Sequence, residues 1–137
     1  MVFGFSVEER VMNIIIKINK KIRKEEKLEK IDIVGLLHLI KKLKEKIDEI
    51  EDREKLEKAA EKLRVIFGLT SKWKKVSMFR SVAVQTGNLL EVSKEKPPAK
   101  SNISKGLSNL INSLTALVED IKEKEVIASG KLKPSFS

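Results

Sequence analysis

The chain contains no cysteine and no tyrosine, and it has a single histidine, His38. Without cysteine it can form no disulfide, no thiolate metal site and no cysteine nucleophile. The Glu-x-x-His pair of di-iron helical bundles is also missing, because the residue three places before His38 is Gly35. The sequence therefore predicts no catalytic residue, no cofactor-binding residue and no metal ligand, and we expect a protein that is not an enzyme.

Phosphate-binding loops and long apolar runs are missing as well. Neither a G-x-x-x-x-G-K nor a G-x-G-x-x-G pattern occurs among the six glycines. The longest apolar run near the N-terminus is Ile14–Ile16, far short of the about 20 residues of a membrane-spanning helix. Residues 1–6 lack the basic start and the apolar core of a signal peptide. We therefore expect a soluble protein of the cytoplasm.

What the chain does contain is helical periodicity. Apolar residues recur at steps of four and three along two segments, a spacing that puts them on one side of an α-helix. They are Leu36, Ile40, Leu43, Ile47 and Ile50 in the first segment, and Ile103, Leu107, Leu110, Leu114, Leu117 and Ile121 in the second. Because such a stripe must be covered, the sequence predicts an all-α fold. We expect an antiparallel, up-and-down four-helix bundle with one extra or kinked helical segment.

Side chains that can cap a helix N-terminus divide the chain into successive helices. The capping residues are Ser6 with Glu9 as its capping-box partner, Asp32, Asp52, Thr70 or Ser71, and Ser101 or Ser104. The helices they begin are expected to end near residues 27, 50, 67, 92 and 127. A single helix over 33–67 is the alternative to the second and third of these.

Glycine and proline predict where helices end. Gly68 fits the left-handed position that follows a helix C-terminus. The segment Glu95–Ala99 contains two consecutive prolines, which cannot lie in a helix interior, and it is the predicted linker. Gly130 is expected to stop the last helix. We therefore predict one helical-bundle domain over residues 1–130 and a flexible C-terminal tail over 131–137.

The net charge is +9, from 29 Lys and Arg residues against 20 Asp and Glu residues. Many Lys and Glu residues with few thermolabile ones are typical of a hyperthermophile protein, although an A/T-rich genome gives a similar bias. Most carboxylates stand next to lysines on polar helix faces. We therefore interpret them as solvated side chains and not as catalytic acids or bases.

Two basic ridges give the alternative hypothesis, which is binding of nucleic acid. The residues of these ridges are Lys17, Lys20, Lys21 and Lys24 in the first, and Lys72, Trp73, Lys74 and Lys75 in the second. The second ridge interleaves an aromatic ring with cations, as in proteins that bind single strands. If the two ridges converge, they could hold a phosphate backbone. Nearby glutamates weaken the first ridge, and Trp73 falls close to the apolar stripe of its helix.

Apolar residues beyond the core stripes favour protein–protein contact as the function. The candidate interface residues are Met12, Ile16, Val34, Leu37, Met78, Val82 and Leu89. The competing interpretation is that these residues belong to a wide internal core. A twofold homodimer is the commonest way to cover such a surface. We therefore expect a non-enzymatic interaction module that forms a homodimer and binds a protein partner, whose identity the sequence leaves open.

The length of 137 residues, the start Met1-Val2-Phe3-Gly4-Phe5 and the Lys-, Ile- and Glu-rich helices carry one resemblance. The whole chain resembles a small helical protein encoded by the spindle-shaped virus of the hyperthermophilic archaeon Pyrococcus abyssi. This resemblance implies a four-helix bundle similar to that of focal adhesion kinase, a dimeric state and a role in protein–protein contacts. It also implies a location in the host cytoplasm or in the virion. No catalytic residue follows from it.

Overall fold

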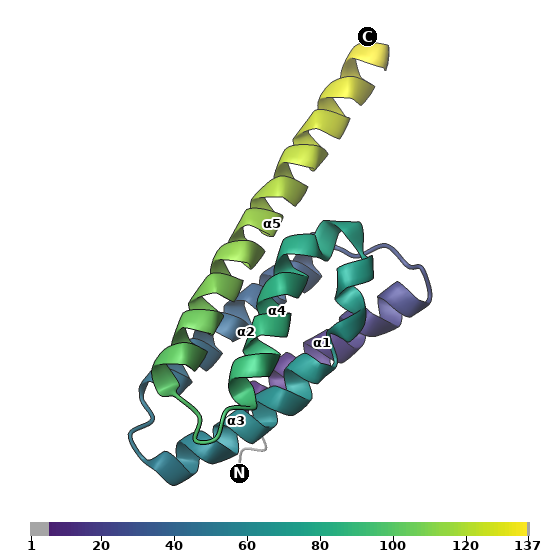
Figure 1. Ribbon diagram of the computed structural model, residues 1–137. Helices are drawn as coiled ribbons and strands as arrows, with labels where there is room; N and C mark the ends of the chain where they lie inside the picture. Colours follow the sequence, from purple (N-terminus) through teal and green to yellow (C-terminus); the bar gives the residue numbers. More distant parts are fainter. Residues whose placement is uncertain (1–5, 137) are drawn as a thin grey trace, which may run out of the picture.

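The computed structural model describes residues 6–136, with side chains described as far as Ile121 (Figure 1). Over these residues it consists of α-helices and short 3₁₀ turns and has no strand, which confirms the predicted all-α class. The elements are α1 (Val7–Arg23), α2 (Lys30–Asp48), α3 (Arg53–Gly68), the 3₁₀ turns η1 (Ser71–Lys75) and η2 (Ser77–Phe79), α4 (Arg80–Ser93) and α5 (Lys100–Phe136).

The helices pack side by side in an order that differs from their order in the chain. α2 packs against α5, α5 against α4 and α4 against α3, while α1 contacts both α2 and α3. Helices that follow one another in the chain run in opposite directions (Figure 1), as short connections require. α1 and α3 therefore run in the same direction. The C-terminal part of α5 extends beyond the other helices (Figure 1).

Both apolar stripes lie in the core. From Leu36 to Ile47 and from Ile103 to Leu114, every member of the two stripes is buried. Each such side chain contributes about 1.5–3 kcal/mol relative to an exposed position. The stripes belong to α2 and α5, which pack directly on each other. Their spacing thus predicted both the helices and the faces that they bury.

Two of the predicted N-caps are confirmed. The hydroxyl of Ser6 accepts a hydrogen bond from the backbone N–H of Glu9 at 3.2 Å. The carboxylate of Asp52 accepts one from the backbone N–H of Glu54 at 3.1 Å. Residues 33–67 therefore do not form one continuous helix, because α3 has its own capped start at Arg53.

The predicted role of Asp32 as an N-cap is wrong. α2 begins at Lys30, and its N-cap residue is Glu29. Asp32 is the third residue of the helix, and its carboxylate accepts the backbone N–H of Glu29 at 3.1 Å. Glu29 and Asp32 form a capping box in which both partners are acidic. Asp32 therefore stabilises the predicted helix N-terminus, but from the third position inside the helix.

The left-handed conformation predicted for Gly68 after α3 is wrong. Such a conformation occurs at the end of α1, at Glu25. Glu25 has a φ of 55°, and the N–H of Glu26 donates to the carbonyl of Lys21 at 2.8 Å. This six-to-one hydrogen bond is the Schellman arrangement. α1 accordingly ends at Arg23, a few residues before the predicted position.

Gly68 is the last residue of α3, and none of the glycines in the described part of the chain has a positive φ. The carbonyl groups at this end are satisfied by a tighter turn. The N–H of Leu69 donates to the carbonyl of Ile66, and the N–H of Thr70 donates to that of Phe67. The hydroxyl of Thr70 also donates to the carbonyl of Phe67 at 2.8 Å. Bonds of this 3₁₀ type leave no need for a left-handed residue.

The predicted helix over 71–92 is wrong in its first half. Two 3₁₀ turns, η1 and η2, occupy residues 71–79, and α4 begins only at Arg80. Trp73, Val76 and Phe79 are three residues apart, which suits a 3₁₀ helix with three residues per turn as well as it suits an α-helix. The rings of Trp73 and Phe79 lie 4.8 Å apart between centroids, inside the core.

The linker over residues 95–99 is confirmed, since α4 ends at Ser93 and α5 begins at Lys100. The last helix was predicted to end near residue 127, but the backbone of α5 remains helical past Gly130 to Phe136. Ser137 lies outside the described residues. The division into a domain over 1–130 and a flexible tail over 131–137 stays a prediction.

Candidate functional site

The predicted interface residues do not form one surface. They are Met12, Ile16, Val34, Leu37, Met78, Val82 and Leu89. Val82 and Leu89 are fully buried, because α4 is covered by α3 on one side and by α5 on the other, so both residues belong to the core. Met12, Leu37 and Met78 are half-buried against that core. Only Ile16 and Val34 are exposed, the first by 47%.

Ile16 lies next to an apolar groove between α1 and α3. The groove has a volume of about 250 Å³ and is lined by Glu8, Glu9, Met12, Lys62, Val65 and Ile66. Ile16 follows Met12 by one helical turn and so lies on the same side of α1. Val65, which is 59% exposed, lines the groove from α3. We call this surface, with Ile16 included, the α1–α3 groove.

Sequence reasoning missed Val65, although a signal was present. The buried positions of α3 are Ala59, Ala60, Leu63, Ile66 and Phe67. Val65 lies between two of these positions and off the side of the helix that they define, so its apolar side chain is left outside the core. A large apolar residue that is out of phase with the stripe of its own helix is the pattern that identifies a surface residue of this kind.

An ion pair between a buried carboxylate and an exposed lysine lies beside the α1–α3 groove. The carboxylate of Glu8, which is almost fully buried, accepts a hydrogen bond from the ammonium group of Lys46 at 2.7 Å. Burial raises the pKa of the Glu8 carboxyl. The hydrogen bond and charge of Lys46, with the charge of Lys62, outweigh burial and hold the pKa below its ordinary value. The charge beside the groove is therefore already neutralised.

Half of the first basic ridge is neutralised within the protein. Lys17 and Lys21 both pair with the buried carboxylate of Asp32, at 3.2 and 2.8 Å. Burial raises the pKa of the Asp32 carboxyl. The two lysines and the backbone N–H of Glu29 lower it by more than burial raises it, so the pKa lies below its ordinary value. The other two lysines of this ridge, Lys20 and Lys24, are exposed and form no ion pair with a described residue.

The second basic ridge loses its aromatic residue. Lys72, Lys74 and Lys75 are exposed on η1, but the indole of Trp73 is completely buried and packs on Phe79. An indole in this position has no exposed face on which a base could stack. The predicted contact of Trp73 with nucleic acid is therefore corrected to a core role.

The two ridges nevertheless lie at the same end of the molecule, because α1 is tied to η1. The side-chain amide of Asn19 donates to the carbonyl of Leu69 at 2.8 Å and accepts from the indole N–H of Trp73 at 2.6 Å. Asn19 precedes Lys20 on α1, and Trp73 stands between the lysines of η1. The convergence that the nucleic-acid hypothesis requires is thus present in part, without the stacking aromatic.

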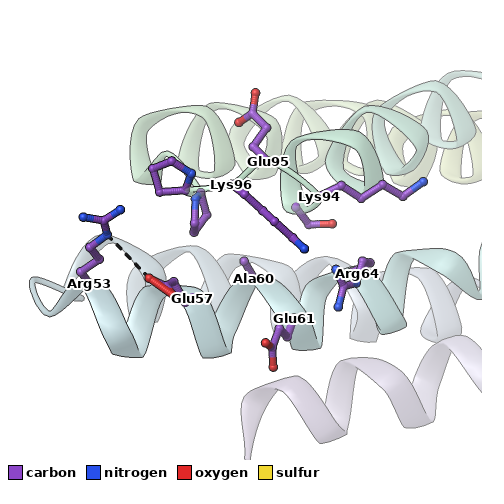
Figure 2. Close-up of a pocket in the computed structure, with 11 residues that line it drawn as sticks. Arg53, Glu57, Ala60, Glu61, Arg64, Lys94, Glu95 and Lys96 are labelled. Atoms are coloured by element: carbon purple, nitrogen blue, oxygen red, sulfur yellow. Dashed lines mark ion pairs between the residues drawn. The ribbon is translucent and has the colours of Figure 1, made fainter.

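A second hollow, of about 430 Å³, lies between α3 and the linker that joins α4 to α5 (Figure 2). It is lined by Arg53, Glu57, Ala60, Glu61, Arg64, Ser93, Lys94, Glu95, Lys96, Pro97 and Pro98. Figure 2 shows Lys96 extending from the linker toward α3, whereas Glu95 and Glu61 point away from the hollow. We call this feature the α3–linker cavity. No sequence motif indicated it, because its two walls are about 30 residues apart in the chain.

Among the side chains of residues 6–121, no group of three or more His, Asp or Glu residues is arranged to hold a metal ion. His38 is exposed on α2. None of the helices in residues 6–136 has the length together with the apolarity needed to cross a membrane.

The chain matches no family model, no curated protein and no solved structure.

Proposed function

We propose that this chain is a non-enzymatic protein–protein interaction module that forms a homodimer through the α1–α3 groove. The observation that carries the proposal is the exposure of Ile16 and Val65 on neighbouring helices that flank an apolar hollow. Large apolar groups gathered beside a hollow are typical of a binding surface. In a twofold dimer the groove of each copy covers that of the other, so one surface suffices.

We also propose a specific helix arrangement, a protein partner, an origin and a location for this chain. We propose an antiparallel four-helix bundle, in which α2, α5, α4 and α3 pack in succession and α1 is the extra segment that spans from α2 to α3. A further protein partner, archaeal viral origin, and location in the host cytoplasm or in the virion are part of the same proposal. They rest on the resemblance to the Pyrococcus abyssi virus protein.

Matched valine substitutions test the dimer. Val65→Glu places a charge in the groove, while Val84→Glu places the same charge on α4 at a valine with a similar exposed fraction, 56%. The helical neighbours of Val84 are Arg80, Ser81, Gly87 and Asn88, so no apolar patch surrounds it. We expect Val65→Glu to weaken dimerisation about 30-fold or more, as loss of a central contact does, and Val84→Glu to leave it unchanged.

Light scattering over a range of concentrations gives the mass of each variant, and thermal melts show that each remains folded. Ile16→Glu should behave like Val65→Glu, since both residues border the groove. A wild-type chain that stays monomeric at high micromolar concentration contradicts the dimer. Equal loss of dimer in Val65→Glu and Val84→Glu contradicts the assignment of the groove.

Nucleic-acid binding is the second candidate function, and the tie between Asn19 and Trp73 is the observation that favours it. That tie brings Lys20 on α1 and Lys74 on η1 to one end of the molecule. Gel-shift titration of duplex and single-stranded DNA across salt concentrations tests this candidate. Retention of DNA at moderate salt, lost in a variant with Lys20→Ala and Lys74→Ala, would favour it over the interaction module.

A further inference from the structure

The α3–linker cavity has fixed walls. α3 forms the floor with the small, buried Ala60, and the linker forms the opposite side with Pro97 and Pro98. Lys100, which follows the linker, donates to the backbone carbonyls of Asp48 and Ile50 at 3.4 and 2.9 Å. These bonds tie the start of α5 to the end of α2. The linker thus has an anchored end next to the cavity that it shares with α3.

The acidic groups that line the cavity are occupied or turned away from it. Glu57 pairs with Arg53 at 3.6 Å at one end, and Glu95 accepts a hydrogen bond from the amide of Asn102 at 3.2 Å. Glu61 points to the far side of α3 (Figure 2). None of these three carboxylates therefore forms an ion pair with Arg64 or Lys96.

The basic groups Arg64 and Lys96, in contrast, have no anionic partner. Within the described residues neither forms an ion pair or a side-chain hydrogen bond. They come from opposite walls, Lys96 from the linker and Arg64 from α3, and Lys96 extends toward α3 across the cavity (Figure 2). Two unpaired cations that line the same cavity attract an anion, and the guanidinium group offers paired N–H donors that match a phosphate.

We propose that the α3–linker cavity binds a small molecule that carries a phosphate group. Arg64 and Lys96 bind the phosphate, and the rest of the ligand lies against Ala60 and the two prolines. The volume of about 430 Å³ falls in the range of small-molecule sites and exceeds what a phosphate ion alone fills. From Arg53 to Arg64 the floor runs along about 16 Å of α3, enough for a nucleotide-sized body. This site is separate from the α1–α3 groove.

Titration of the ¹⁵N-labelled protein with inorganic phosphate and with adenosine monophosphate tests the proposal. We expect saturable shifts of the backbone amide resonances of residues 60–64 and 94–96. Adenosine monophosphate should bind more tightly than phosphate, because only the nucleotide reaches the apolar wall. Absence of saturation by either probe up to about 10 mM overturns the proposal, and equal affinity for both overturns the role of the wall.

Single substitutions identify the groups that bind the phosphate. Arg64→Ala and Lys96→Ala should each weaken the affinity about tenfold, the effect of losing one charge-assisted hydrogen bond. Lys41→Ala is the matched control, since Lys41 is an exposed lysine of α2 that does not line the cavity. All three side chains lie outside the core, so the variants are expected to fold. A loss as large in Lys41→Ala would mean non-specific attraction of anions and would overturn the site.

Discussion

The carboxylate of Asp32 joins two helices through contacts that sequence alone did not reveal. Only 2% of this residue is exposed. Its Oδ2 atom accepts hydrogen bonds from Lys21 and from the backbone N–H of Glu29, and Lys17 forms an ion pair with Oδ1 at 3.2 Å. Burial acts to raise its pKa, but these donors outweigh burial and lower it. As the pH falls, Asp32 of the unfolded chain therefore binds a proton first, while Asp32 of the folded protein is still ionised.

Asp32→Asn should lower the free energy of unfolding at pH 7 by about 1–2 kcal/mol, with the lysines' exposure keeping the effect modest. Because the pKa is lower in the folded state, the stabilisation is complete above the unfolded value. It is lost as the pH falls through the folded value. The difference between Asp32→Asn and wild type should thus shrink below about pH 4. Urea unfolding at several pH values measures it.

Glu49→Gln is the control for Asp32→Asn. Glu49 is exposed and its side chain has no partner within the described part of the chain. We expect it to change stability by less than about 0.5 kcal/mol at every pH. If the loss in Asp32→Asn were the same at pH 7 and at pH 3, the lowered pKa of Asp32 would not be its cause.

At the scale of the element, sequence predicted what local chemistry decides. The Ser6 and Asp52 caps follow from hydrogen bonds within a few residues, and the linker at 95–99 follows from the geometry of proline. The 3₁₀ turns were missed because residues spaced by three fit two helix types. Val82 and Leu89 were misplaced because their exposure depends on α3 and α5, which cover α4 from both sides.

For the surfaces, too, the sequence predicted single exposed residues but not the grooves that two segments form together. Ile16 lies off the stripe of its own helix, and the sequence identified it as exposed. The α1–α3 groove was out of reach, because it exists only once two helices that are not consecutive in the chain run side by side. The α3–linker cavity depends in the same way on where the linker crosses α3, which no local pattern specifies.

Replacement by alanine should have opposite effects on stability at two glycines in neighbouring helices, Gly106 and Gly87. A Cβ atom at Gly106 of α5 would lie 2.7 Å from Cδ2 and 3.1 Å from Cγ of Leu89, which is fully buried and cannot move away freely. A Cβ atom at Gly87 of α4 meets nothing within 4 Å. Gly87→Ala should therefore gain up to about 1 kcal/mol from helix propensity.

Gly106→Ala gains the same propensity but overpacks the contact between α4 and α5, and we expect a net loss of about 1 kcal/mol. Denaturant unfolding of both variants checks the pair, with Gly87→Ala as the control for propensity. Stabilisation of similar size in both would show that Leu89 yields easily and that α4 and α5 do not approach each other as closely as described.

At the scale of the whole molecule, the helices enclose one core and α5 alone extends past it (Figure 1). α5 packs on α2 and α4. Within residues 100–121 of this helix, Leu114 is the last completely buried residue, and Leu117 is nearly so. The free end of the helix has no other helix beside it in Figure 1. The core should therefore not depend on that end for stability.

A chain that ends at Ile121 should fold and keep its melting temperature to within about 4 °C, a shift that corresponds to roughly 1 kcal/mol. Circular dichroism measures the melt. A chain that ends at Asn112 is the control. It removes Leu114 and Leu117 from the core and should lose several kcal/mol. Equal destabilisation by both truncations would mean that residues after 121 also contribute to the core.

The hydrogen bonds of Asn19 also give this protein an intrinsic optical reporter. With one tryptophan and no tyrosine in the chain, its near-ultraviolet emission comes from a single indole. That indole is buried on η1 and bonded to an amide from α1, so it meets water only when these two segments separate. Its emission wavelength consequently follows tertiary disassembly, whereas dichroism follows helix content. Superposition of the two signals would establish that the protein unfolds in one cooperative step.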